Sequence, residues 1–223
     1  MLKAPIVMVN FKLYPQASGK NAVKLAKIME KVSRETGAEV AAVVNALDYH
    51  AVKDSVNIPV LLQHVDAVDF GAHTGRINIE LAKEHGVEAI LINHSERQLK
   101  VSDIEFLVSK AHTLGIETVV CTNNPSVSAA IATFNPTYIA MEPPELIGGD
   151  VSVSKAKPEA ITETIQAVKR VSDIPVLVGA GVKNGDDVRR AIELGAKGVL
   201  VASGITKAKD PEAALRNLVS GLM

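Results

Sequence analysis

The sequence has little of several features that mark specialised classes of protein. Its 223 residues include one cysteine, Cys121, so no disulfide can form within the chain and nothing requires an oxidising compartment. No apolar run is long enough to span a bilayer, and the first residues show no apolar signal-peptide region. The formal net charge of -1 argues against nucleic acid or an anionic membrane as the main partner. We therefore expect a cytoplasmic, enzyme-like globular protein.

What the chain does contain is a series of short apolar runs rich in β-branched residues, each followed by a helical pattern. Their hydrophobicity is continuous, as strands buried on both faces of a parallel sheet require. Their spacing averages about 27 residues, the length of one βα unit. Eight such units predict a closed (β/α)8 barrel, formed as one domain over residues 1–223, with a doubly wound open sheet as the alternative. The runs cover residues 6–11, 39–45, 60–65, 89–93, 117–122, 138–141, 175–179 and 198–202.

The segments between these runs carry the expected helix signals. Apolar residues recur at helical spacing from Ala22 to Val32, with lysines off that stripe. Asp210-Pro211-Glu212 combines an N-cap residue, a first-turn proline and a first-turn acid. The helices near residues 47–52 and after Pro125 are expected to be short.

In a barrel of this kind, the residues that end each strand meet at one face, where chemistry takes place. Glu142 directly follows the sixth run, and two prolines come after it before a loop that closes with Gly148-Gly149. An acid at a strand end beside a loop that can open and close suggests a catalytic base under a lid. The alternative is a solvated acid in a turn, which is the commoner meaning of an isolated Glu-Pro pair.

Two further strand ends carry groups that chemistry can use. Lys12 directly follows the first run and is either a surface lysine or a clamp for an anion. His94 directly follows the fourth run, and Ser95 is expected to cap the following helix so that amides of its first turn point at the imidazole. Their partial positive charge, with Lys12 nearby, disfavours the imidazolium form and leaves His94 a neutral donor. A purely structural histidine is the alternative.

Three stretches of the chain resemble those that mark the triosephosphate isomerases. They are Asn10-x-Lys12, His94-Ser95-Glu96-Arg97, and Met141-Glu142-Pro143 followed by Ile147-Gly148-Gly149. They occur in the family's order, each at the end of the expected strand. The resemblance covers nearly the whole chain and is greatest to a shorter branch of the family, whose TIM barrel has trimmed helices.

This resemblance implies an aldose-ketose isomerase that interconverts dihydroxyacetone phosphate and D-glyceraldehyde 3-phosphate through an enediol(ate), in glycolysis and gluconeogenesis. By the matching positions, Glu142 accepts the proton, His94 is the electrophile, and Lys12 balances the charge of the dianion and the enolate. Asn10 binds the substrate, and Glu96 supports Lys12. No metal and no organic cofactor is needed, because preorganised donors can stabilise the enolate.

The family also implies where the phosphate group binds. Backbone N–H groups of Ile147, Gly181, Ala202 and Ser203 occupy the matching positions. An ordinary tight turn is the alternative for residues 179–181. This stretch lacks the tyrosine and serine with which the family latches its closed lid, and Glu145 stands where the lid has a tryptophan.

The loop at residues 71–75 resembles the one that the family inserts beside a neighbouring subunit's active site, with Thr74 completing that site. A homo-oligomer is therefore expected, and the short branch implies a homotetramer. Arg76 stands where an acid commonly pairs across the interface with the arginine matching Arg97, so the interface chemistry must differ. Cys121 is expected to be a buried packing residue behind the base.

Two other functions remain open from the sequence. A different phosphosugar barrel enzyme, such as an isomerase or epimerase of larger substrates, would share the phosphate end of the barrel but has no reason to carry both Lys12 and the 94–97 stretch. A non-catalytic barrel that binds metabolites or protein partners is the contrasting class.

Overall fold

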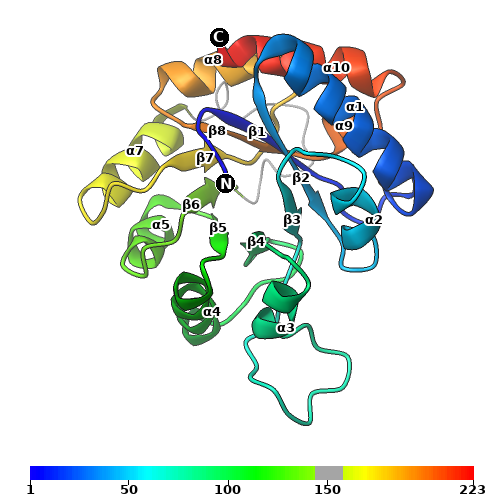
Figure 1. Ribbon diagram of the computed structural model, residues 1–223. Helices are drawn as coiled ribbons and strands as arrows, with labels where there is room; N and C mark the ends of the chain where they lie inside the picture. The colour runs from blue at the N-terminus through cyan, green and yellow to red at the C-terminus, as the bar shows by residue number, and fades with distance from the viewer. Residues whose placement is uncertain (144–157) are drawn as a thin grey trace.

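The computed structural model describes residues 1–143 and 158–223 of the chain. Eight parallel strands form a closed barrel in sequence order, and β1 pairs with both β2 and β8. Helices surround the barrel (Figure 1). The predicted (β/α)8 barrel is confirmed, and the alternative of an open, doubly wound sheet is wrong.

All of the predicted apolar runs form strands, but six of the strands end one to three residues before the run does. Apolar residues beyond these ends still pack in the core: Phe11 and Val65 are fully buried. Burial thus continues beyond the assigned strand, although the Phe11 amide still donates to the Val43 carbonyl over 2.9 Å. The strands are β1 Ile6–Asn10, β2 Glu39–Val44, β3 Val60–Leu62, β4 Ala89–Ile92, β5 Glu117–Thr122, β6 Tyr138–Met141, β7 Val176–Val178 and β8 Gly198–Val201.

Several of the outer helices are short, as the sequence predicted. The predicted stripe from Ala22 to Val32 is the buried face of α1, and the Asp210 side chain caps α10 by accepting from the Ala213 amide. The helices are α1 Lys20–Thr36, α2 Tyr49–Lys53, α3 Ile79–Glu84, α4 Val101–Leu114, α5 Pro125–Ala132, α7 Pro158–Lys169, α8 Gly185–Glu193, α9 Ser203–Thr206 and α10 Pro211–Val219, with 3-10 turns η1 Pro15–Ala17 and η3 Ser220–Leu222.

One predicted helix start is wrong. Ser95 does not cap a helix, because α4 begins only at Val101 and its cap position is Lys100. The residues between form a turn in which the Arg97 amide donates to the His94 carbonyl over 2.7 Å.

The core has two shells, as the alternation of side chains along barrel strands requires. On β1, Ile6 and Met8 belong to the cluster inside the barrel, whereas Val7 and Val9 belong to the larger cluster between the barrel and the helices. The interior is thus filled by side chains, and a ligand can be held only at the mouth.

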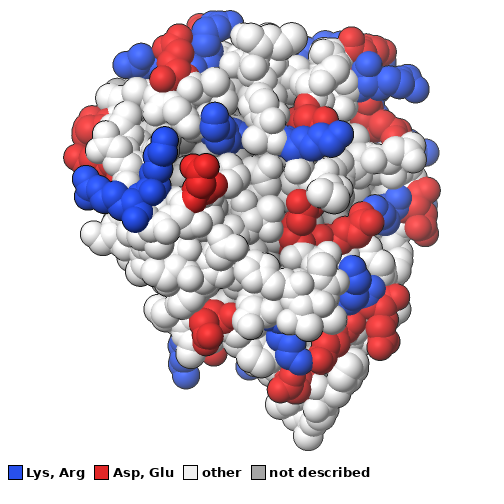
Figure 2. All heavy atoms as spheres, turned by 60° about the vertical axis from the view of Figure 1, so that its left-hand side comes forward, with Lys and Arg blue, Asp and Glu red and all other residues white. Residues whose placement is uncertain are grey.

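The loop between β3 and α3 projects away from the barrel (Figure 1). Asp66 and Asn78 form a β-bridge at its base, and Phe70 near its tip is 61 % exposed. Charges of both signs alternate over the face in Figure 2, in keeping with the near-neutral net charge. Among the described residues, no helix is long and apolar enough to cross a membrane.

Candidate active site

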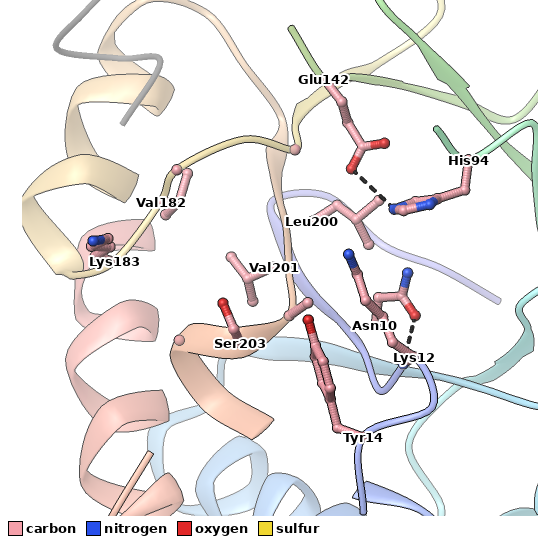
Figure 3. A pocket seen from close by; sticks show the side chains of 14 residues that line it. Asn10, Lys12, Tyr14, His94, Glu142, Val182, Lys183, Leu200, Val201 and Ser203 are labelled. Atoms are coloured by element: carbon pink, nitrogen blue, oxygen red, sulfur yellow. Dashed lines mark hydrogen bonds and ion pairs between the residues drawn. The ribbon is translucent and has the colours of Figure 1, made fainter. Parts of the chain in front are cut away.

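A cavity of about 340 Å³ opens at the carboxyl ends of the strands (Figure 3). It brings together seven of the predicted site residues: Asn10, Lys12, His94, Glu142, Gly181, Ala202 and Ser203. Two predicted residues do not line this cavity: Glu96 contacts Lys12 and His94 from beside it, and Thr74 is exposed on the projecting loop. The predicted lid and its Ile147 lie outside the described residues, apart from Pro143.

Glu142 is held at the end of β6 with little contact to polar groups. Its amide donates to the Thr122 carbonyl over 2.8 Å, and the residue is 4 % exposed. Within the described part of the chain, its Oε2 atom has no hydrogen-bond partner. Burial raises the pKa of Glu142 to about 7, against the opposing hydrogen bond of Cys121 and the charge of Lys12. A carboxylate with this pKa is a stronger base than an exposed one.

Room for this side chain comes from the neighbouring strand end. A Cβ atom at Gly179 would lie 2.4 Å from Cγ of Glu142, so a larger residue there would displace the carboxylate. Cys121 is 2 % exposed, and burial with the charge of Glu142 raises the pKa of its thiol. The thiol therefore stays protonated, and its packing position agrees with the one predicted.

His94 faces Glu142 across the pocket. Its Nδ1 atom accepts a hydrogen bond of 3.2 Å from the Glu96 amide, so the neutral ring carries its proton on Nε2. Nε2 lies 3.6 Å from Oε1 of Glu142, as the dashed line in Figure 3 marks. Burial lowers the pKa of His94, and the charge of Lys12 lowers it further. The lowered pKa and the hydrogen bond to Nδ1 both favour the expected neutral imidazole, although a turn rather than a helix supplies the amide.

Lys12 has a left-handed backbone conformation, with φ of 48°, which residues other than glycine rarely adopt. Its ammonium lies 2.7 Å from Oε1 of Glu96, and its side chain is 14 % exposed. The Oδ1 atom of Asn10 accepts from the Lys12 amide over 3.0 Å and from Gln63 over 3.2 Å. Because that oxygen is occupied, the amide nitrogen of Asn10 is the group left to donate into the pocket.

The other end of the pocket is built from backbone and small side chains. Gly181 has φ of 67°, a conformation that favours glycine, and it follows the end of β7. Ala202 begins the turn into α9, where its carbonyl accepts from the Ile205 and Thr206 amides. The first amides of such a turn have no acceptor within the turn itself, so they are suited to bind an anion.

The structure adds an ion-pair cluster that the sequence did not predict. Asp66, which is 5 % exposed, accepts from the Ile77 amide and Arg76 at 2.8 Å and from His64 and Arg97 at 3.1 Å. Burial opposes ionisation of Asp66, but hydrogen bonds from Ile77, Arg76 and His64 outweigh it and hold the pKa of this carboxyl well below its usual value. The acid that pairs with both arginines thus comes from the same chain.

Other residues that line the pocket were also missed, among them Tyr14, Val182, Lys183 and Gly204. Tyr14 could have been found from its position two residues after Lys12, on the same strand end. In the part of the chain that the structure describes, no three His, Cys, Asp or Glu side chains lie close enough together to hold a metal ion.

Comparison with known proteins gives a consistent result. The family model described as triosephosphate isomerase matches residues 5–220. A triosephosphate isomerase of Archaeoglobus fulgidus is 49 % identical over 220 residues, which cover 98 % of this chain and 99 % of that one. Those of Caldivirga maquilingensis and Methanothermus fervidus are 49 % and 48 % identical, and this chain is covered to 100 % and 97 %. The match covers 99 % and 98 % of those two relatives.

Proposed function

Because the chain belongs to the triosephosphate isomerase family, we propose that its pocket interconverts dihydroxyacetone phosphate and D-glyceraldehyde 3-phosphate. The reaction is a step of glycolysis and, in the reverse direction, of gluconeogenesis. The observation that carries this proposal is the meeting of Glu142, His94 and Lys12 around one cavity. A barrel enzyme for larger phosphosugars has no support among the relatives, which are named for the triose reaction.

Proton transfer is assigned to Glu142. Its carboxylate takes a proton from C1 of dihydroxyacetone phosphate, and the electron pair of that bond forms the C1–C2 double bond of the enediolate. The same carboxyl group then returns a proton to C2. As the aldehyde forms, the C1 hydroxyl loses its proton, and His94 Nε2 passes a proton to the oxygen on C2, which becomes the product hydroxyl. One base serves both carbons because they are adjacent, and its pKa of about 7 suits proton transfer in both directions.

Stabilisation of the negative charge that develops on the substrate's carbonyl oxygen is assigned to His94, Lys12 and Asn10. The Nε2–H group of neutral His94 donates to the carbonyl oxygen, which gains negative charge as the carbon loses its proton. The Lys12 ammonium compensates that charge and the charge of the phosphate, and the Asn10 amide donates to a substrate oxygen. Glu96 keeps the lysine in place through its 2.7 Å ion pair.

The phosphate is assigned to the opposite end of the pocket, where backbone amides of Gly181, Ala202 and Ser203 can approach it closely. Ile147 is proposed to add an amide from the lid. Binding the dianion far from the reacting carbons fixes C1 and C2 beside Glu142, which lowers the entropic cost of reaching the transition state.

We further propose a cytoplasmic homotetramer of single-domain subunits. Thr74 lies exposed on a loop that projects from its own barrel, and this position is suited to complete the site of a neighbour. The mass in solution, measured by light scattering after gel filtration, should be that of four subunits. The mass of a monomer or a dimer would contradict this part of the proposal.

A coupled isomerase assay tests the proposed activity. Replacing Glu142 by Gln keeps the shape but removes the base, so turnover should fall at least about 10³-fold while a phosphate ester such as glycerol phosphate still binds. Glu163→Gln, on the exposed face of α7, is the matched control and should retain full turnover. A wild-type protein without turnover would mean a non-catalytic barrel, and an active Glu142→Gln variant would exclude this base.

A further inference from the structure

One residue of the pocket has no part in the chemistry assigned above. Tyr14 follows β1, two residues beyond Lys12, and lines the cavity together with Ser203 and Gly204. In Figure 3 its ring stands upright at the edge of the cavity, and its hydroxyl group points toward Ser203 and the end of β8. This is the end of the pocket to which the phosphate is assigned.

The backbone of Tyr14 is fixed by a tight turn. Its carbonyl accepts from the Ala17 amide at 2.8 Å and from the Ser18 hydroxyl at 2.9 Å. Pro15 occupies the first position of the 3-10 turn η1, which restricts the chain directly after Tyr14. The direction in which the side chain leaves the backbone is therefore set before any ligand binds.

A second contact fixes the ring. The Lys207 ammonium lies 4.0 Å from the centroid of the Tyr14 ring, within the range of a cation–π interaction. Lys207 directly follows α9, the short helix that begins at Ser203. The ring thus connects the loop after β1 with the loop after β8, and the turn and the lysine together hold it in the orientation seen in Figure 3.

The Tyr14 hydroxyl group has no hydrogen-bond partner among the described residues. The residue is only partly exposed, and the polar residues Lys12 and Ser203 line the same cavity. A ring that served packing and the cation–π contact alone would not need this oxygen, because phenylalanine offers the same face. A free donor aimed at an anion site is suited to bind the anion.

We propose that Tyr14 donates its hydroxyl hydrogen to a phosphate oxygen of the bound triose phosphate and so selects phosphorylated over unphosphorylated trioses, with Lys207 as the positioning residue that holds the ring. The proposal rests on the proposed function for its substrate. A hydrogen bond to a charged acceptor is stronger than one between neutral groups, so the loss of this one donor is measurable.

Tyr14→Phe tests the donor while it keeps the ring and the cation–π contact. The inhibition constant of inorganic phosphate and the KM for D-glyceraldehyde 3-phosphate should each rise about tenfold. The slow turnover of D-glyceraldehyde, which has no phosphate, should stay within about twofold of wild type, because truncated substrates do not use this interaction. Equal losses with both substrates, or unchanged phosphate affinity, would overturn the assignment.

Tyr138→Phe is the matched control, since this tyrosine belongs to the cluster inside the barrel and does not line the cavity. It should change neither phosphate affinity nor KM. Calorimetric titration of wild type and Tyr14→Phe with inorganic phosphate gives the same answer without turnover. If the protein proves inactive as an isomerase, this binding measurement still decides whether Tyr14 contacts phosphate.

Lys207→Met tests the positioning role. If the lysine acts through the Tyr14 hydroxyl, phosphate affinity falls two- to threefold in the wild-type background and does not fall further in Tyr14→Phe. Lys207→Arg should restore the affinity, because arginine also binds aromatic faces. Lys209→Met, which removes a nearby exposed charge, controls for long-range attraction. Losses that add in the double variant would mean that Lys207 attracts the phosphate directly and does not act through Tyr14.

Discussion

Glu142 and Asp66 are buried to almost the same degree, with 4 % and 5 % of each residue exposed, and both lie at the carboxyl end of a barrel strand or just beyond it. Their carboxyl groups nevertheless behave in opposite ways. Burial raises the pKa of Glu142 to about 7, whereas donors hold the pKa of Asp66 well below its usual value.

The difference lies in the donors around each acid. Asp66 accepts hydrogen bonds from four residues, two of them arginines. One oxygen of Glu142 has no partner among the described residues, and Gly179 leaves the space beside it without a side chain. Burial without donors raises the pKa of a carboxyl group and makes it a stronger base. Burial with several hydrogen-bond donors lowers the pKa and keeps the group ionised. The same fold thus keeps one acid reactive and the other ionised and inert.

The largest expected effect separates the two acids by pH. Because Glu142, as the proposed base, must be ionised to accept a proton and its pKa is about 7, kcat/KM should fall about tenfold for each pH unit below 7, and about 100-fold by pH 5. Asp66→Asn should leave this acidic limb where it is. The substrate phosphate itself titrates near pH 6, so NMR of ¹³C-labelled glutamate should identify the Glu142 carboxyl directly. A Glu142 signal titrating near 4.5 would show that burial does not raise the pKa of Glu142, and the contrast with Asp66 would be lost.

The next effect is on stability. Asp66→Asn removes the charge that four donors surround, and the free energy of unfolding should fall by about 2 to 3 kcal/mol at pH 7. Since the folded pKa of Asp66 lies below its ordinary 3.8, its contribution is present above that value and is lost as pH falls further. The curves of variant and wild type should therefore converge in acid, as urea unfolding from pH 7 downward can measure.

Asp69→Asn is the control on the same loop. Its carboxylate pairs with Lys110 at 3.0 Å, but its side chain is 67 % exposed, so its loss should cost less than about 1 kcal/mol. An equal loss from Asp66→Asn and Asp69→Asn would mean that the buried cluster contributes no more than a surface pair.

Substitution of Glu142 should change the free energy of unfolding in the opposite direction from Asp66→Asn. Glu142→Gln removes a carboxylate that is buried without enough donors, so it should raise the free energy of unfolding at pH 8. The expected gain is only about 1 to 2 kcal/mol, because the new amide also lacks hydrogen-bond partners. The folded pKa of Glu142 is raised, so the cost of its charge appears only above the ordinary value of 4.5. The gain should therefore vanish below that pH. Destabilisation at pH 8 would show that the charge of Glu142 is compensated after all.

The contrast between these acids also marks what the sequence could reveal. Glu142, His94 and Lys12 were predictable because each directly follows a recognisable strand, and barrel geometry collects strand ends at one face. Asp66 was not, because its role depends on Arg76 and Arg97, which lie 10 and 31 positions away and reach it only in the folded loops. The place of Tyr14 near the pocket could have been read from its position two residues after Lys12, but its contact with Lys207 could not, because that residue is at the other end of the chain.

The fold was predicted more completely than its boundaries. Continuous apolar runs locate strands that are buried on both faces, and all of them formed. Their ends were misplaced because hydrophobicity reports burial and not pairing, as the buried but unpaired position of Val65 beyond β3 illustrates. The start of α4 was misplaced because the Arg97 amide bonds to the His94 carbonyl, and this turn delays the helix to Val101.

The smallest expected effect adjusts the basicity of Glu142 without removing it. The Cys121 thiol donates to this carboxylate and lowers its pKa against the effect of burial. Cys121→Ala should therefore raise the pKa of Glu142 and shift the acidic limb of kcat/KM upward by about half a pH unit, with little change in the plateau rate. Cys121→Ser keeps a donor of similar size and should bring the limb back. If alanine and serine shift the limb equally, the thiol acts on Glu142 through packing and not as a donor. The pKa of Glu142 would then depend on its surroundings at Gly179 and His94 and not on a hydrogen bond from Cys121.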